Sequence, residues 1–125
     1  MQKQAAIQFI ERLFKEVWSQ PNPAKIDEFY QQDVTGYFGD QKITLADIKN
    51  RANVAQQLYS HIQTEILDMV VEDNKIALRL KQTSAKKDGT DPLVLNLLSI
   101  YHVHDNKVTK VWFLVDKPFD YKEKA

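Results

Sequence analysis

The sequence contains no cysteine and only three glycines among its 125 residues. Without cysteine there is no disulfide, no thiolate nucleophile and no cysteine-ligated zinc. No glycine-rich phosphate loop, nucleophile elbow or HExxH pair occurs either. These absences exclude several common enzyme classes and give no reason to expect a metal or another cofactor.

An excess of charge of one sign is also missing. Lysine plus arginine and aspartate plus glutamate number 17 each, so no net field attracts nucleic acid or an anionic membrane. The longest nearly apolar run, residues 93–103, is broken by three polar residues and is too short to cross a bilayer. Residues 1–6 begin an amphipathic pattern and do not resemble a secretory signal. We therefore expect a cytoplasmic protein that binds neither nucleic acid nor membranes.

Three helices are predicted in the first half of the chain. In residues 3–19 the apolar side chains recur at helical spacing and form one stripe. Asn22 can cap a short second helix, because a proline follows it at the first helical position. Thr44 and Asp47 form a pair that resembles a capping box, and the third helix should run from there to about Tyr59.

From residue 61 onward the periodicity is that of strands. The Asp-Asn pairs at 73–74 and 105–106 are hairpin signals between β-rich runs. The chain should therefore form a four-stranded antiparallel meander, with one more strand near residue 36. Residues 1–125 are predicted to be a single α+β domain in which three N-terminal helices pack on a curved, mainly antiparallel sheet and enclose an apolar pocket. The four predicted strands of the meander are residues 61–72, 75–84, 92–104 and 107–116.

Both faces of the last two strands are apolar. In the final strand Trp112 and Leu114 alternate with Phe113 and Val115. Antiparallel sheets that are solvated on one side show polar alternation, and three helices cannot easily cover both faces. We expect a second copy of the chain to cover the remaining face in a homodimer. The alternative is that the sheet curls enough to bury its own apolar side chains.

Several stretches, in this order and at this spacing, resemble one known family. They are the Val-Trp-Ser-Gln close of the first helix (17–20), the glycine-then-helix entry (39–48), the two hairpins (68–79 and 100–108), and Trp112 followed by Asp116. With these stretches the chain is similar to the SnoaL-like family of the nuclear transport factor 2-like superfamily, which includes polyketide cyclases and ketosteroid isomerase. The resemblance covers about residues 5–118 and is more specific for the fold than for any activity.

The resemblance implies a cone-shaped barrel with a deep apolar pocket, usually built as a dimer. The pocket would bind a small, largely apolar organic molecule. If the protein is an enzyme, the resemblance suggests an isomerase, cyclase or hydratase that moves protons without a cofactor. The alternative is a non-catalytic binding or protein-interaction module that dimerises through its sheet. The candidate ligand-binding residues are Trp112, Leu114, Arg79, Tyr37, Tyr59, Phe14 and Tyr101.

Asp116 is the candidate catalytic residue. It ends an apolar strand, so partial desolvation could raise the pKa of its carboxyl and suit it to acid/base work. In cyclase-like members the matching aspartate is the proposed acid/base catalyst. The alternative is an ordinary strand-end carboxylate that is exposed or caps a backbone group. No complete catalytic set carries over, because residues 81–86 lack the histidine of the cyclase-like pattern and the first helix lacks the tyrosine of ketosteroid isomerase.

Two further sets of polar side chains have open roles. Arg79 could bind a ligand carboxylate, or it could pair with Asp116 or Glu65. His102 and His104 project from the same face of one strand. A metal would need a third ligand, so ordinary strand-end histidines are expected and no metal site is predicted.

Overall fold

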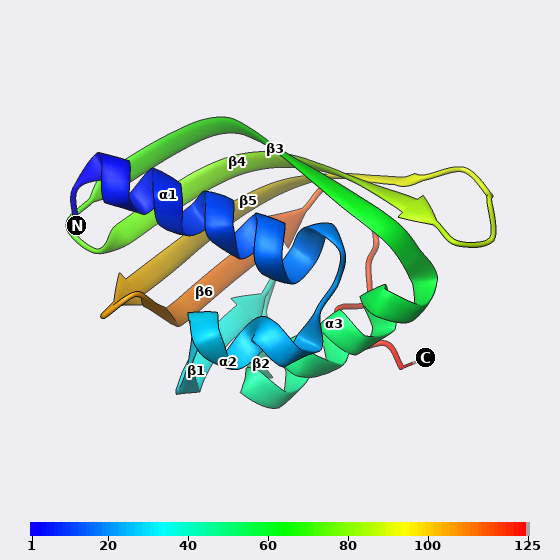
Figure 1. The fold of residues 1–125 in the computed structure, drawn as a ribbon, viewed down its shortest axis with the longest axis horizontal. Helices are drawn as coiled ribbons and strands as arrows, with labels where there is room; N and C mark the ends of the chain where they lie inside the picture. Colours follow the sequence, from blue (N-terminus) through cyan, green and yellow to red (C-terminus); the bar gives the residue numbers. More distant parts are fainter. Residues whose placement is uncertain (125) are drawn as a thin grey trace.

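The helices lie on one face of a single curved sheet in the computed structural model, which describes residues 1–124 (Figure 1). This arrangement confirms the predicted α+β class. The elements in chain order are α1 (Lys3–Leu13), a π-helical turn (Phe14–Ser19), a 3-10 turn (Pro23–Lys25), α2 (Ile26–Phe29), β1 (Tyr30–Phe38), β2 (Gln41–Thr44), α3 (Leu45–Leu58), β3 (Tyr59–Glu72), β4 (Lys75–Lys86), β5 (Leu93–His104) and β6 (Lys107–Val115).

The first helix buries the predicted apolar stripe but changes geometry near its end. Phe9, Ile10 and Leu13 are buried on α1, and the last six residues form the π-helical turn Phe14–Ser19. A π-helical turn is wider than an α-helical one and is frequent at functional sites. Here it places Phe14 and Trp18 at the wall of an internal cavity.

The predicted helix starts are confirmed by their hydrogen bonds. The Asn22 side chain accepts a hydrogen bond from the backbone N–H of Ala24 at 3.2 Å. At the start of α3, the carboxylate of Asp47 accepts one from the backbone N–H of Thr44 at 2.8 Å and completes a capping box. Both caps satisfy donors that the first turn of a helix leaves free.

The six strands pair in the order β2-β1-β6-β5-β4-β3. Strands β3 to β6 form the predicted antiparallel meander, whereas β1 runs parallel to β6. At the hairpins Asp73, Asp105 and Asn106 take positive φ, as tight turns of this kind require. Within residues 1–124 the edge strands β2 and β3 do not pair, so the curved sheet is not a closed barrel.

Two details near the parallel pair were not predicted. Strand β2 is only four residues long and follows the expected turn at Gly39, and β1 begins at Tyr30, earlier than expected. A close approach between strands explains a glycine in β1. A Cβ atom on Gly36 would lie 2.6 Å from the carbonyl oxygen of Val111 in β6, far inside van der Waals contact.

The core lies between the helices and the inner face of the sheet. Leu95, Leu97 and Tyr101 of β5 are buried there, whereas Leu98 and Leu114 on the outer face are 55% and 58% exposed. The sheet therefore does not curl enough to bury its own outer apolar side chains.

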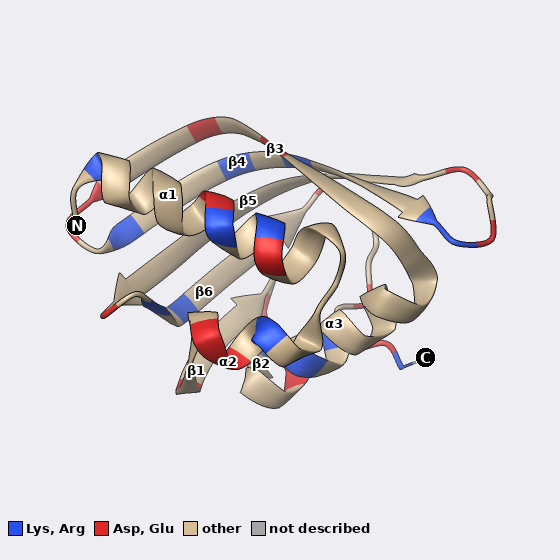
Figure 2. Ribbon diagram, viewed as in Figure 1, with Lys and Arg blue, Asp and Glu red and all other residues tan. Residues whose placement is uncertain are grey.

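Figure 2 shows acidic and basic residues interspersed over the ribbon, in keeping with the balanced composition. None of the helices in residues 1–124 has the length and hydropathy needed to cross a membrane.

Candidate functional site

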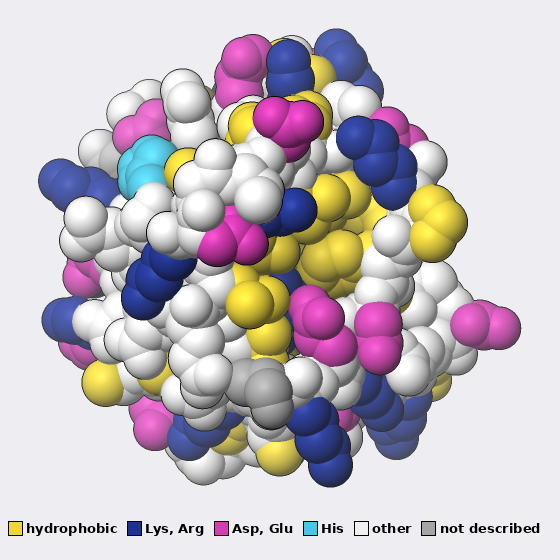
Figure 3. All heavy atoms as spheres, turned by 90° about the vertical axis from the view of Figure 1, so that its right-hand side faces the viewer, with side chains coloured by type: hydrophobic (Ala, Val, Ile, Leu, Met, Phe, Trp, Pro, Cys, Tyr) yellow, Lys and Arg dark blue, Asp and Glu magenta, His cyan; other side chains and the backbone are white. Residues whose placement is uncertain are grey.

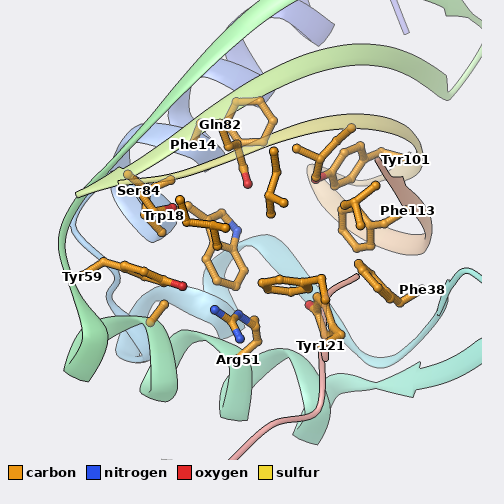
Figure 4. Close-up of a pocket in the computed structure, with 17 residues that line it drawn as sticks. Phe14, Trp18, Phe38, Arg51, Tyr59, Gln82, Ser84, Tyr101, Phe113 and Tyr121 are labelled. Atoms are coloured by element: carbon orange, nitrogen blue, oxygen red, sulfur yellow. The ribbon is translucent and has the colours of Figure 1, made fainter. Parts of the chain in front are cut away.

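A cavity of about 80 Å³ lies between the inner face of the sheet, the end of the first helix and α3. Its walls are mostly aromatic and aliphatic, and Figure 4 shows the side chains converging on it from all of these elements. Trp18 comes from the π-helical turn, Phe38 from β1 and Phe113 from β6. The Trp18 side chain is fixed, because its indole N–H donates a hydrogen bond to the Tyr30 hydroxyl at 3.3 Å.

The residues after β6, 117–124, form a C-terminal strap over one end of this cavity. Tyr121 of the strap is 7% exposed, and its ring centre lies 5.3 Å from that of Phe38. Phe119 also lines the cavity. The strap is anchored on α3, since the side-chain amide of Asn50 donates to the backbone carbonyl of Glu123 at 3.0 Å.

One cation lies in this apolar wall. Arg51 of α3 is only 6% exposed and lines the cavity. Its Nη1 donates to a carboxylate oxygen of Glu123 in the strap at 2.7 Å, and its guanidinium carbon lies 4.7 Å from the centre of the Phe119 ring. A buried charge is stable only when it is paired, so this ion pair holds α3 and the strap together.

The other polar groups of the cavity are hydroxyls and an amide. Tyr59, at the start of β3, points its hydroxyl into the same space as the Arg51 guanidinium (Figure 4), and Tyr101 contributes from β5. Burial raises the pKa of Tyr101 well above its usual value of 10.0, so its hydroxyl stays protonated and can donate. Gln82 and Ser84 of β4 complete the polar lining.

The wall of the cavity thus carries hydrogen-bond donors but no carboxylate, because the Glu123 carboxylate that pairs with Arg51 lines the adjoining space toward the surface. Among residues 1–124, no aspartate, glutamate or histidine lines the cavity itself. An arginine and tyrosine hydroxyls suit an oxygen that carries negative charge or develops it, such as a carboxylate or an enolate. This set contains no group that could take up a proton as a carboxylate or an imidazole would.

A wider vestibule of about 420 Å³ adjoins the cavity. Tyr59, Leu93 and Phe119 line both spaces, and the outer rim carries charged residues that include Lys86 and Glu123. On the side of the molecule with the β4–β5 hairpin, Figure 3 shows hydrophobic side chains lining a hollow with charged side chains around it. The cavity and the vestibule therefore share part of their walls.

Three of the seven predicted ligand-binding residues line the cavity: Phe14, Tyr59 and Tyr101. Three others, Trp112, Leu114 and Arg79, lie instead along a groove of about 420 Å³ on the outer face of the sheet. The expectation that Trp112 and Leu114 face the internal pocket is wrong, because Phe113 and Val115 occupy the inner positions of β6.

The remaining predicted residues also lie outside the cavity. Tyr37 is 39% exposed and stands beside Trp112 in the parallel pairing of β1 with β6. Within residues 1–124 Arg79 makes no ion pair, so the expected pairing with Asp116 or Glu65 is not formed.

Asp116 is an exposed carboxylate just past the end of β6. One oxygen accepts from the backbone N–H of Asn96 at 3.0 Å and the other from the Asn96 side-chain amide at 2.8 Å. These hydrogen bonds lower its pKa below the usual 3.8. The expected rise in pKa through desolvation is therefore wrong. The structural alternative, a strand-end carboxylate that caps a backbone group, matches these contacts.

The two strand histidines do not converge with other ligands. His102 packs on Trp112 with ring centres 4.9 Å apart, and desolvation is the main cause of its lowered pKa. His104 lies 3.4 Å from the carboxylate of Asp105 at the hairpin. No group of three or more histidine, aspartate or glutamate side chains that could hold a metal occurs in residues 1–124.

Sequence reasoning missed the charged residue of the cavity and the strap. Arg51 falls three residues after Ile48 and four before Ala55, so helical spacing places it on the same buried face of α3. A charged residue at such a position was a usable signal. Phe119 and Tyr121 follow the last strand without any periodicity, so no local pattern pointed to them.

The fold is shared with solved structures of low sequence identity. PrhC from Penicillium brasilianum has a TM-score of 0.78 at 16% identity, with 91% of this chain and 82% of PrhC covered. A protein proposed to be a polyketide cyclase from Acidithiobacillus ferrooxidans has a TM-score of 0.74 at 16% identity, covering 94% of this chain and 92% of that one. A protein from Catenulispora acidiphila, described as having a ketosteroid isomerase-like fold and solved with trimethylamine, has a TM-score of 0.70 at 10% identity, covering 85% and 83%.

The family is established by sequence. No curated protein matches the chain, but the family model described as SnoaL-like polyketide cyclase matches residues 8–118, which is most of its length. The matched residues run from α1 to the start of the C-terminal strap and so include nearly all of the cavity wall. The predicted resemblance is therefore confirmed, and the chain belongs to the SnoaL-like polyketide cyclase family.

Proposed function

We propose that the chain binds a small, largely apolar, ring-containing organic molecule in the internal cavity and its vestibule, in the cytoplasm. The observation that carries this proposal is the composition of the wall. Aromatic side chains surround the space, and the polar groups that converge on it include the hydrogen-bond donors Arg51, Tyr59 and Tyr101. Ligand sites commonly combine an apolar lining with a few convergent polar groups.

Any catalysis at this site would rest on charge stabilisation. Arg51 and the tyrosine hydroxyls could stabilise an enolate or another oxyanion that forms on the ligand. That role suits the cofactor-free isomerase, cyclase or hydratase reactions predicted from the family. The acid/base role of Asp116 stays a prediction, and the binding proposal does not depend on it, because the carboxylate is held by Asn96 outside the cavity.

Calorimetric titration with 2-naphthamide, a neutral two-ring probe, tests the binding proposal. We expect saturable binding with one site per chain. Replacing Tyr101 with phenylalanine keeps the ring and removes one hydrogen-bond donor, so affinity should fall by roughly threefold to tenfold. The absence of saturable binding, or equal affinity for a linear amide of the same carbon number, would contradict the proposal.

A second proposal concerns the outer face of the sheet, which we infer to be a homodimer interface. Val70, Leu98 and Leu114 are 61%, 55% and 58% exposed there, and clustered exposed apolar side chains mark interaction surfaces. A second copy is the simplest partner, because two-fold symmetric dimers are the commonest assemblies. Sedimentation equilibrium should give twice the chain mass of 14.6 kDa. A single monomeric species at high protein concentration would contradict this proposal.

A further inference from the structure

The C-terminal strap separates the cavity from its vestibule. Phe119 lines both spaces, and Tyr121 packs between Phe38 and Phe113 with ring centres 5.3 Å and 6.0 Å away. With the strap in this position the cavity measures about 80 Å³. An engineered cavity that holds one benzene molecule measures about 150 Å³. A ligand with even one aromatic ring therefore needs more room than the cavity has with the strap in this position.

Movement of the strap would connect the cavity to the adjoining vestibule of about 420 Å³. The two spaces together fall within the range of about 300–1,000 Å³ that is usual for ligand pockets. Few contacts hold the strap on α3. They are the Arg51–Glu123 ion pair, the contact of the Arg51 guanidinium with the Phe119 ring, the hydrogen bond from Asn50, and an ion pair of 3.6 Å between Lys122 and Asp47.

The Arg51–Glu123 ion pair is asymmetric in exposure. The Arg51 side chain is 7% exposed, whereas that of Glu123 is 39% exposed. If the strap opened, Glu123 would enter water at little cost, but Arg51 would stay behind on a helix. An arginine that loses its carboxylate partner but keeps the apolar cavity wall beside it is less stable than the paired arginine, even where opening lets water reach it. Opening therefore costs more for a neutral ligand than for a ligand whose anionic group takes the place of the Glu123 carboxylate.

We propose that the cavity binds organic anions, namely a carboxylate attached to an apolar ring system, and that the ligand carboxylate replaces Glu123 on Arg51. Without ligand, the Glu123 carboxylate occupies the position on Arg51 that the ligand carboxylate would take, and the strap opens and closes as the two carboxylates exchange. This inference rests on the proposed binding function and adds the charge of the ligand and the residue with which it competes. Arg51 suits the role because guanidinium binds carboxylates through two parallel hydrogen bonds.

The experiment compares two nearly isosteric probes, 2-naphthoate and 2-naphthamide, which differ in charge. Their dissociation constants are measured by calorimetry for the unmodified chain, for Glu123→Gln and for Lys122→Gln. Lys122→Gln is the matched control, because it removes a strap–α3 ion pair and leaves the Glu123 carboxylate on Arg51. We expect the unmodified chain to prefer 2-naphthoate.

The two variants should act differently. Glu123→Gln removes the competing charge, so 2-naphthoate should bind roughly threefold to tenfold tighter while 2-naphthamide changes no more than it does in Lys122→Gln. Lys122→Gln should change both probes by the same factor. Binding of 2-naphthamide with no preference for 2-naphthoate in any variant would overturn the anion inference and leave the proposed function intact. Failure of both probes to bind all three proteins would overturn the proposed function as well.

Discussion

Filling the cavity from α3 tests whether it is available space. Ala55 is fully buried and lines the cavity, and leucine at this position adds three carbon atoms toward a space of about 80 Å³. Each buried methylene contributes about 0.8 kcal/mol, and fixing a leucine side chain costs about 0.5–1 kcal/mol. Ala55→Leu should therefore raise the free energy of unfolding by about 1.5 kcal/mol, which corresponds to about 5 °C in Tm for a domain of this size.

A matched control lies one turn earlier on the same helix. Ala52 is also fully buried, but it packs in the main core and does not line the cavity. Leucine there has no space to enter, and overpacking costs about 1–3 kcal/mol. The two alanine-to-leucine variants should thus shift the urea unfolding midpoint in opposite directions. Ala55→Leu should also lose its affinity for 2-naphthamide. If it is destabilised as much as Ala52→Leu, the cavity is not usable space and our reading of the site is wrong.

Three further predictions concern residues outside the cavity. Asp116→Asn should leave 2-naphthamide binding unchanged. The pKa of the Asp116 carboxyl is lowered in the folded chain, so the carboxylate stabilises the fold above about pH 4, and this stabilisation is lost as pH falls through the folded pKa. In urea titrations the stability difference between the variant and the unmodified chain should therefore shrink in acid. A difference that grows in acid would contradict this sign. Gly36→Ala should lower the free energy of unfolding by about 1–3 kcal/mol in urea titrations, because its Cβ would meet the Val111 carbonyl; an unchanged midpoint would refute the steric account. If the outer sheet face is the homodimer interface, Leu114→Glu should leave only monomer in light scattering after size exclusion, whereas Gln57→Glu on the exposed side of α3 should leave the dimer intact. Equal effects of both would argue against the outer sheet face.

Much of the fold could be predicted because strand alternation and helix caps are local. The strand expected at residues 92–104 is Leu93–His104, and the one expected at 107–116 is Lys107–Val115. The cap pair Thr44 and Asp47 marks the start of α3. In each case the signal and the structure involve residues close in sequence, so a single chain is enough to find them.

Alternation did not reveal which face of the sheet is the inner one. Trp112 and Leu114 are as apolar as Phe113 and Val115. Periodicity places the two sets on opposite faces of the strand but does not show which face points toward the core. That choice depends on where α1 and α3 pack, which is a tertiary property. The second set lines the cavity and the first lies along the outer groove.

The strap was missed for a related reason. The contact between Arg51 and Glu123 joins residues far apart in the chain, and residues 117–124 contain no helix or strand. Their positions are fixed by long-range packing of Phe119 and Tyr121. Such contacts leave no period in the sequence, although they determine the size and the charge of the site.

The most direct test of ligand binding in the cavity uses the two tryptophans. Trp18 lines the cavity, and Trp112 lies along the outer groove. Their indole N–H signals can be assigned with the single variants Trp18→Phe and Trp112→Phe, and then followed by NMR during titration with 2-naphthamide. We predict a saturable shift of the Trp18 signal while the Trp112 signal stays in place. A shift of Trp112 alone, or of neither signal, would contradict the assignment of the internal cavity as the binding site.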